Sequence, residues 1–273
     1  MKNIILGILL LSVTVSFSQK KPKIKGSKVV IEVNEVLQSF TAIKLLDDLK
    51  IEVMRSRESG YYIHGDDNLM DVLKFDVKDS TLYISSFYKI TSKKKLDIVI
   101  HYEELNTIML DAGSIDVKDA INTDYLEVQL QGNSKLVLNA QATEVGIVMA
   151  GSSDAEMTVD CDVVRVKLDE KSGLKLYATV DAAQLNMNGN TAVKIEGAVS
   201  NFDFDIFGNA QLKAEGFQAA IVNANLKESA DAKIFVGDSL NVSAKGASKT
   251  YLYGTPKITV IDFLDTAQLL KKE

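Results

Sequence analysis

The sequence of 273 residues predicts an all-β protein, a single-stranded parallel β-helix with about 19 residues in each coil. Three observations predict this fold: short segments recur at a nearly constant spacing, turn-forming residues stand at their starts, and apolar and polar residues alternate inside them. Alternation with a period of two is typical of strands. Self-similarity at a fixed period indicates a solenoid in which each repeat forms one coil.

Nine segments define the repeat, and most of them begin with glycine followed by Asn, Ser or Ala. The starts are Gly113, Gly132, Gly151, Glu170, Gly189, Gly208, Glu228, Gly246 and Asp265. Consecutive starts lie 19 residues apart, except for one step of 20 (208 to 228) and the following step of 18 (228 to 246). At about 4.8 Å per coil, eight or nine coils predict a rod about 40 Å long.

Alignment of the copies predicts which side chains form the core. The position four before each start is apolar in every copy, from Met109 to Ile261. The positions four and six after the start are also mostly apolar, and the position two after it is mostly small, as at Ser134 and Ala210. We therefore expect a core of Val, Leu, Ile and Met along the axis, with small residues stacked at a tight corner.

Other repeat folds fit the sequence less well. A β-propeller blade needs about 40–50 residues, and a leucine-rich repeat has a different spacing of Leu and Asn. A hexapeptide left-handed β-helix places an inward residue at every sixth position, whereas the apolar positions here come in pairs two apart. We expect a right-handed coil, which is the usual hand of parallel crossovers.

Residues 1–18 have the layout of a secretory signal peptide. Lys2 precedes an apolar run, and small residues at 16 and 18 precede a cleavage site before Gln19. The run is shorter than the about 20 residues of a membrane-spanning helix, and no membrane span is expected in the mature chain. Residues 19–28 are expected to be a flexible basic lead-in. The protein is therefore expected to be exported, to the periplasm, the outer-membrane surface or the medium.

Residues 29–105 contain short alternating strands that do not keep the 19-residue period. Residues 65–68 and 78–80 are rich in turn formers, and residues 89–95 are expected to form a solvated loop. We expect this part to form irregular first coils that cap the solenoid, because an open end is an unpaired sheet edge. Residues 106–273 are expected to form the regular β-helix, joined to the cap without a linker.

Composition argues against several classes of function. The chain has 31 Lys and Arg against 37 Asp and Glu, a net charge of −6, so nucleic acid is not an expected partner. One cysteine excludes a disulfide scaffold. His64 and His101, the only histidines, lack metal-ligand spacing, so neither a metal nor another cofactor is predicted. Cys161 is expected to be a buried, inert thiol.

Neighbouring carboxylates are the residues that polysaccharide cleavage would need. Glu196 and Glu215 both stand seven after a repeat start and form the best candidate pair in the sequence. Asp203 and Asp205 flank Phe204 and are expected to point outward from a strand. We predict no catalytic residue.

A row of Asn and Ser directly follows the repeat starts. Its members are Ser114, Asn133, Ser152, Asn190 and Asn209. Stacked amides can form an inward ladder that satisfies its own hydrogen bonds, which is the interpretation we favour, or an outward polar ridge able to bind sugars.

Further motifs lie in the strand-rich first part: F-x-A-I at 40–43, I-x-G-D at 63–66 and L-x-I at 82–84, followed by the repeated corners. Over roughly residues 38–254 this pattern resembles the GIN domain, the head of a family of bacterial autotransporter-type adhesins. The resemblance implies a parallel β-helix on or near the cell surface, and it brings no established catalytic residues.

The expected function is that of an exported, non-enzymatic cell-envelope protein, an adhesin-like or interaction surface whose partner is a surface glycan or an envelope protein. Two alternatives stay open. One is a carbohydrate-active β-helix enzyme, and the other is a scaffold that polymerises end to end through its coils.

Overall fold

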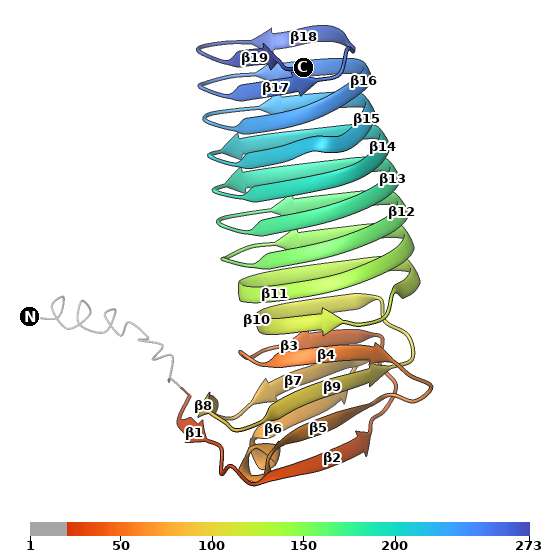
Figure 1. The fold of residues 1–273 in the computed structure, drawn as a ribbon, viewed down its shortest axis with the longest axis vertical. Coiled ribbons are helices and arrows are strands. Elements are labelled where there is room, and N and C mark those ends of the chain that lie inside the picture. Colours follow the sequence, from red (N-terminus) through yellow and green to blue (C-terminus); the bar gives the residue numbers. More distant parts are fainter. Residues whose placement is uncertain (1–20) are drawn as a thin grey trace, which may run out of the picture.

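Strands with alternating inward and outward side chains wind this chain into a stack of flat coils (Figure 1). A computed structural model describes residues 21–273. It is all-β, with 73% strand and 2% helix, and forms a β-solenoid of about 9 turns with about 19 residues per turn. The predicted fold class is therefore confirmed. The predicted signal peptide lies outside the described residues.

The regular part of the solenoid consists of long strands that bend around the corners, followed by shorter ones in the last coils. They are β10 (Thr107–Val117), β11 (Ile121–Met149), β12 (Asp154–Leu168), β13 (Gly173–Gly189), β14 (Ala192–Gly208), β15 (Gln211–Leu226), β16 (Asp231–Ala244), β17 (Lys249–Tyr253), β18 (Lys257–Phe263) and β19 (Gln268–Lys271). Each coil pairs in parallel with the next, so that Leu174 lies opposite Val193 and Val193 opposite Leu212. Equivalent residues of successive repeats therefore stack along the axis.

Each repeat start is a corner with left-handed backbone. All nine predicted starts have positive φ, from 60° at Gly132 to 86° at Gly208, and Glu170, Glu228 and Asp265 adopt it without being glycine. This region is costly for residues that carry a Cβ atom, which explains why glycine dominates the position. The repeat register is confirmed from Gly132 onward, whereas Gly113 lies opposite Ser134 and not opposite Gly132.

The core runs along the axis, as predicted. The side chains four before, four after and six after each start are mostly buried, and so is the small column two after it, which includes Ser134, Ser153 and Thr191. The Ser153 hydroxyl donates to the carbonyl oxygen of Ala150 at 2.9 Å. Small side chains thus turn inward at each corner and leave room for the sharp bend.

Three predicted core residues are wrong: Met109 at one end of the regular part, and Ile261 and Phe263, which is 38% exposed, at the other. Ile108, and not Met109, pairs with Val128, because β10 lies opposite residues of β11 that come 20 positions later, instead of 19. A similar shift in β18 leaves Ile261 71% exposed. At the first coil the irregularity places an extra residue in β11, between Leu130 and Asn133, and in the last coil the extra residue is Ile261 of β18.

The cap is built from shorter strands and one 3₁₀ helix. They are β1 (Lys23–Lys25), β2 (Val30–Val36), β3 (Ala42–Leu45), β4 (Lys50–Arg55), β5 (Gly60–Asp66), η1 (Asp67–Val72), β6 (Leu73–Lys78), β7 (Thr81–Ser86), β8 (Lys89–Ser92) and β9 (Leu96–Tyr102). The turn expected at 78–80 joins β6 to β7, with positive φ at Asp79 and Ser80. The segment 65–68 leads directly into η1.

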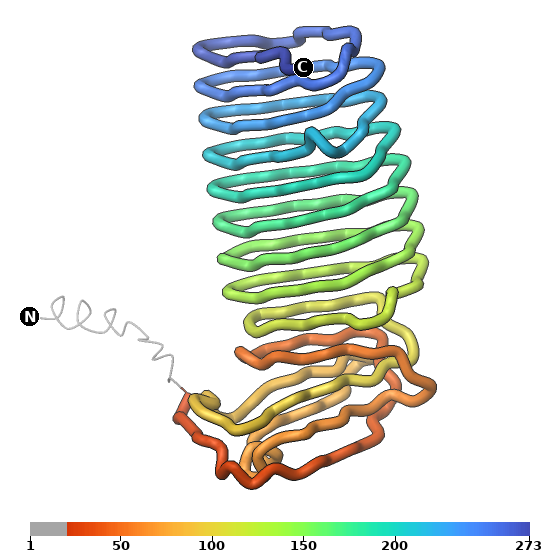
Figure 2. The backbone as a smooth tube through the Cα atoms, in the orientation of Figure 1, coloured from red at the N-terminus to blue at the C-terminus, as the bar shows by residue number. Residues whose placement is uncertain are grey.

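The order of coils in the cap differs from their order in the chain. β10 pairs in parallel with both β3 and β4. On their other side β3 pairs with β7 and β4 with β9, again in parallel. The remaining pairs are antiparallel: β2 pairs with β5, β5 with β9, and β6 with β7. The coil of β3 and β4 thus lies between β10 on one side and the strands β7 and β9 on the other, all of which come later in the chain (Figure 2).

The predicted flexible lead-in is wrong for the described residues 21–28. Residues 23–25 form β1, which pairs in parallel with β8, so part of the predicted loop 89–95 is also a strand. The alternation Lys-Ile-Lys is a short strand signal that the basic composition obscured: Ile24 packs against the core and its two neighbours are exposed.

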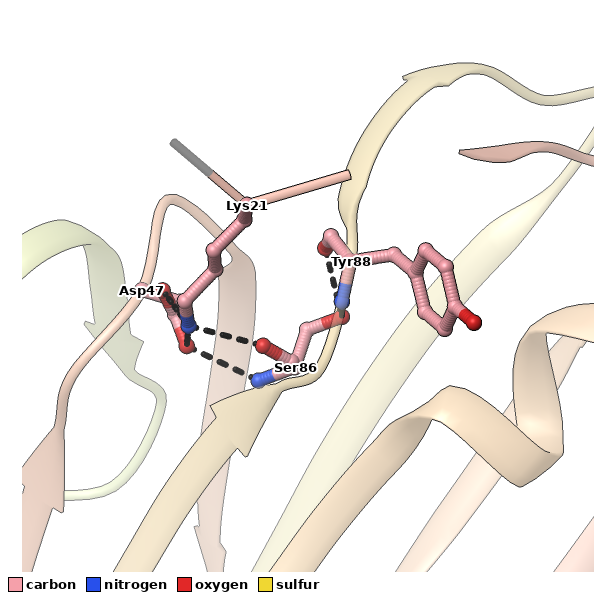
Figure 3. Close-up of polar contacts among 4 residues, drawn as sticks. All are labelled: Lys21, Asp47, Ser86 and Tyr88. Carbon is pink, nitrogen blue, oxygen red and sulfur yellow. Dashed lines mark hydrogen bonds and ion pairs between the residues drawn. The ribbon is translucent and has the colours of Figure 1, made fainter. Parts of the chain in front are cut away.

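The carboxylates of Asp47 and Asp66 hold residues 21–28 against the rest of the cap. Lys21 Nζ lies 2.5 and 2.6 Å from the Asp47 oxygens and donates to the Ser86 carbonyl at 2.8 Å, while the Ser86 amide donates to Asp47 at 2.9 Å (Figure 3). The fully buried Asp66 accepts hydrogen bonds from the amides of Lys28, Lys94 and Lys95 at 3.0–3.2 Å. Asp66 is the last residue of the I-x-G-D motif, which therefore has a structural role in the cap.

Among residues 21–273, no helix is long and apolar enough to cross a membrane.

Candidate functional site: a groove flanked by a lysine row

The predicted carboxylate pair does not form. Lys194 pairs with Lys213, but the register then shifts and Glu196 lies opposite Gly216 instead of Glu215. The cause is a bulge in β15, which takes up the extra residue of the 20-residue repeat and is visible in Figure 2 as a kink in an otherwise even stack. Glu196 instead forms an ion pair with Lys194 at 2.7 Å.

The histidines and the cysteine do not come together either. His64 lies opposite Asp97 and His101 opposite Gly60, so the two histidines are four positions out of register on neighbouring strands. Across residues 21–273, no group of three or more His, Cys, Asp or Glu could hold a metal ion. Cys161 is buried, as predicted. Burial, followed by the charges of its two Asp neighbours, raises the pKa of this thiol to about 11, so the reactive thiolate is scarce at neutral pH.

The Asn and Ser row points outward. Asn133, Ser152, Asn190 and Asn209 are exposed, so the favoured inward ladder is wrong. One amide contact of that kind does form on the outside, where Asn209 Nδ2 donates to Asn190 Oδ1 at 3.2 Å. The inward position of the corner belongs to the next residue, because strand side chains alternate.

Asp203 and Asp205 are exposed on either side of the buried Phe204, as predicted. Asn223 donates to Asp203 at 2.6 Å, and Asn225 donates to Asp205 at 2.7 Å, each from the next coil. These side chains satisfy one another across neighbouring strands and form a polar surface ladder.

A groove of about 550 Å³ lies on the strand face that follows the corners. Its floor lies at Gly173 and Ala192, which are side by side in neighbouring coils and project almost no side chain, and the carboxylate of Asp154 lies over Gly173. Lys135 and Asp154 continue this column in one direction, and Gln211 continues it in the other. The groove thus extends over five coils, about 19 Å at the usual strand spacing.

One flank of the groove continues into a row of lysines. Lys175 pairs in register with Lys194, Lys194 with Lys213 and Lys213 with Lys233. We call these four residues the lysine row. Like charges directly opposite one another on adjacent strands destabilise a sheet, so core packing does not explain their placement.

Acidic partners compensate only half of the lysine row. Lys175 lies 3.5 Å from Glu156, and Lys194 is paired with Glu196. The hydrogen bond to Glu196 and the charge of that carboxylate raise the pKa of Lys194, with a smaller contribution from Glu215. Among the described residues 21–273, Lys213 and Lys233 form no ion pair.

The sequence prediction missed this site, although its signal is present. The lysine row occupies the position five after the start in four consecutive repeats. The position three after the start forms the floor, from Lys135 to Gln211. The two columns define the groove only when they are read together.

Comparisons with known proteins agree with this architecture. A crystal structure of a "putative adhesin" from Parabacteroides merdae superposes with a TM-score of 0.67 at 17% identity, covering 92% of this chain and 100% of that one. A "putative lipid binding protein" from Parabacteroides distasonis gives 0.66 at 18% identity, with the same coverage. At such identities the likeness establishes the fold alone. No curated protein matches the chain.

The sequence itself matches one family, described as "Putative auto-transporter adhesin, head GIN domain", over residues 39–177 and 155–256. The two matches together cover the cap from β3 onward and the solenoid as far as the start of its last coil. This is well over half of the 273 residues. The chain therefore belongs to the head GIN-domain adhesin family.

Proposed function

We propose that this protein is an exported, non-enzymatic, adhesin-like component of the cell envelope that binds an extended glycan on its solenoid surface. Export would depend on the signal peptide predicted in residues 1–18. Membership of the adhesin family supports a binding role.

The observation that carries the proposal is the groove over Gly173 and Ala192. Ligand sites are concave and few per protein, and on solenoids they lie on regular surfaces that several repeats build together. The polar side chains along this groove suit hydroxyl-rich ligands better than apolar ones, because they can exchange hydrogen bonds with them.

The test is binding of the purified mature chain to an array of bacterial and host glycans, with analysis of the products of each hit. We expect binding without cleavage, reduced when Ala192→Gln places a larger side chain on the groove floor. The exposed Ala247→Gln, near the far end of the solenoid, is the matched control. Cleavage of a bound glycan would favour the alternative of a carbohydrate-active enzyme, and absence of any binding would contradict the proposal.

One observation favours a second candidate, association through the last coil. β18 carries Ile258, Val260, Ile261 and Phe263, each between 38% and 71% exposed. Clustered exposed apolar side chains often mark interaction surfaces. This arrangement supports end-to-end assembly as the competing role.

A further inference from the structure

We propose that the groove binds a linear anionic polysaccharide, one bearing carboxylate or sulfate groups, with its charged groups placed along the lysine row. This inference rests on the proposed function, because it names the class of glycan that the same groove would take. The lysine row and the groove floor lie two residues apart on the same strands.

The direction of the lysine row favours a polymer over a small anion. Its four members stand on successive strands of one parallel sheet, so their charges repeat along the solenoid axis at about 4.8 Å. Alternate lysines are then about 10 Å apart, which is the scale of one disaccharide unit. An anionic polysaccharide presents its charges at such regular intervals, whereas a single phosphate or carboxylate would use one or two lysines.

The charge of the lysine row stands out against the rest of the molecule. The whole chain carries a net charge of −6. The groove is lined by four lysines against two acids, Asp154 and Glu156, whereas another depression, lined by Asp160, Asp162 and Asp181, is acidic. Lys213 and Lys233 have no acidic partner among the described residues, so an anionic ligand would supply the missing counter-charge.

The shape of the site favours a single chain over a surface. Ala192 opens the floor beside the lysine row, so a ligand that enters can contact both the backbone and the ammonium groups. A flat lipid surface would reach only the tips of the exposed lysines. A neutral glycan would fit the groove but would form no ion pair with Lys213 or Lys233.

The experiment uses the mature chain and four probes: alginate oligosaccharides as a polyuronate, chondroitin sulfate, neutral dextran, and phosphatidylglycerol vesicles. Lys213→Gln with Lys233→Gln removes the two uncompensated charges. The control, Lys171→Gln with Lys257→Gln, removes two exposed charges outside the groove. Ala192→Gln fills the floor and leaves the charge unchanged. All five positions are on the surface, and circular dichroism with the thermal midpoint verifies that each variant folds.

We expect one or both anionic polysaccharides to bind, with affinity falling as salt rises. The Lys213/Lys233 variant should bind roughly tenfold more weakly, with a shallower salt dependence, and the control should bind like the parent. Ala192→Gln should also weaken binding, because the polymer no longer fits.

Five results would overturn the inference. If Ala192→Gln leaves binding unchanged, the polymer adsorbs to surface charge outside the groove. If both lysine variants weaken binding equally, the lysine row has no special role. If the vesicles bind and neither anionic polysaccharide does, the ligand is a lipid surface and not a polysaccharide. Binding of dextran alone would reject the anionic ligand while the proposed glycan-binding function stands, whereas absence of any glycan binding would reject both.

Discussion

Single residues at the corners set the geometry of every coil. A Cβ atom on Gly151 would lie 2.5 Å from the carbonyl oxygen of Gly132 in the preceding coil, and its φ of 77° is unfavourable for any other residue. Glu170 occupies the equivalent corner with φ of 64°. A residue with a Cβ atom in this conformation costs roughly 1 kcal/mol relative to glycine. The stack therefore contains both relaxed and strained versions of one corner.

Replacements at these two corners should act in opposite directions. Gly151→Ala should destabilise the protein by at least about 1–2 kcal/mol, because it adds both conformational strain and a backbone clash. Glu170→Gly should leave the thermal midpoint unchanged or raise it, because relief of strain offsets the greater freedom of glycine in the unfolded chain. Differential scanning calorimetry measures both. Equal losses of stability in the two variants would contradict this account of the corners.

At the scale of elements, the cap depends on polar contacts that connect distant segments. Asp66 at the end of β5 joins the approach to β2 with the loop between β8 and β9 through three backbone amides. Burial raises the pKa of Asp66, but these hydrogen bonds outweigh it and hold the pKa below its ordinary value. A lowered carboxyl pKa stabilises the fold above the unfolded-state pKa, and this stabilisation is lost as the pH falls through the folded-state pKa.

Asp66→Ala should loosen the cap and leave the solenoid intact. We expect the amides of Lys28, Lys94 and Lys95 to lose protection against hydrogen exchange by at least about tenfold, since each loses its acceptor. Hydrogen exchange with mass spectrometry reports this segment by segment. Asp76→Ala, which removes only an ion pair with Lys74 on a partly exposed strand, is the control. Loosening throughout β11–β16 would argue against a role confined to the cap.

The elements differ in how far sequence alone could predict them. The nine corners and most core columns follow from the period, because each repeat pairs with a neighbour whose sequence it resembles. Met109 is displaced because β10 and β11 pair at an offset of 20 residues, and Glu215 is displaced by a bulge; neither change alters the composition of a strand. The cap could not be predicted in detail, because β3 pairs with strands far away in the chain and no repeat marks them. The groove required two outward columns to be read together, and neither carries a motif.

At the scale of the whole molecule, the two ends of the solenoid are finished differently. The antiparallel strands β2, β5 and β6, together with η1, close the N-terminal end. At the other end, the β18 side chains described above are exposed and alternate with charged residues such as Lys257 and Asp262. A free sheet edge with apolar side chains favours pairing with another chain.

The association candidate predicts a dependence on protein concentration. Static light scattering of the mature chain should show a rising mean mass as concentration increases, and Val260→Lys should abolish the rise by placing charge on the exposed strand. Ile221→Lys, a matched change on an outward position of β15, should have no effect. A monomer at every concentration would reject assembly through β18.

The interleaved coil of the cap also determines when the protein can fold as it emerges N-terminus first. Ala42 pairs with Thr81 and Thr107, which come 39 and 65 positions later in the chain. Leu174, in contrast, pairs with Val193, which comes only 19 positions later. The upper edge of β3 and β4 therefore stays open until β10 has appeared, and such an edge is prone to pair wrongly. After that point each new coil can pair with a coil that has already formed. A factor that shields the emerging chain would thus act mainly on residues before the end of β10, and the remaining coils can be added one after another without it.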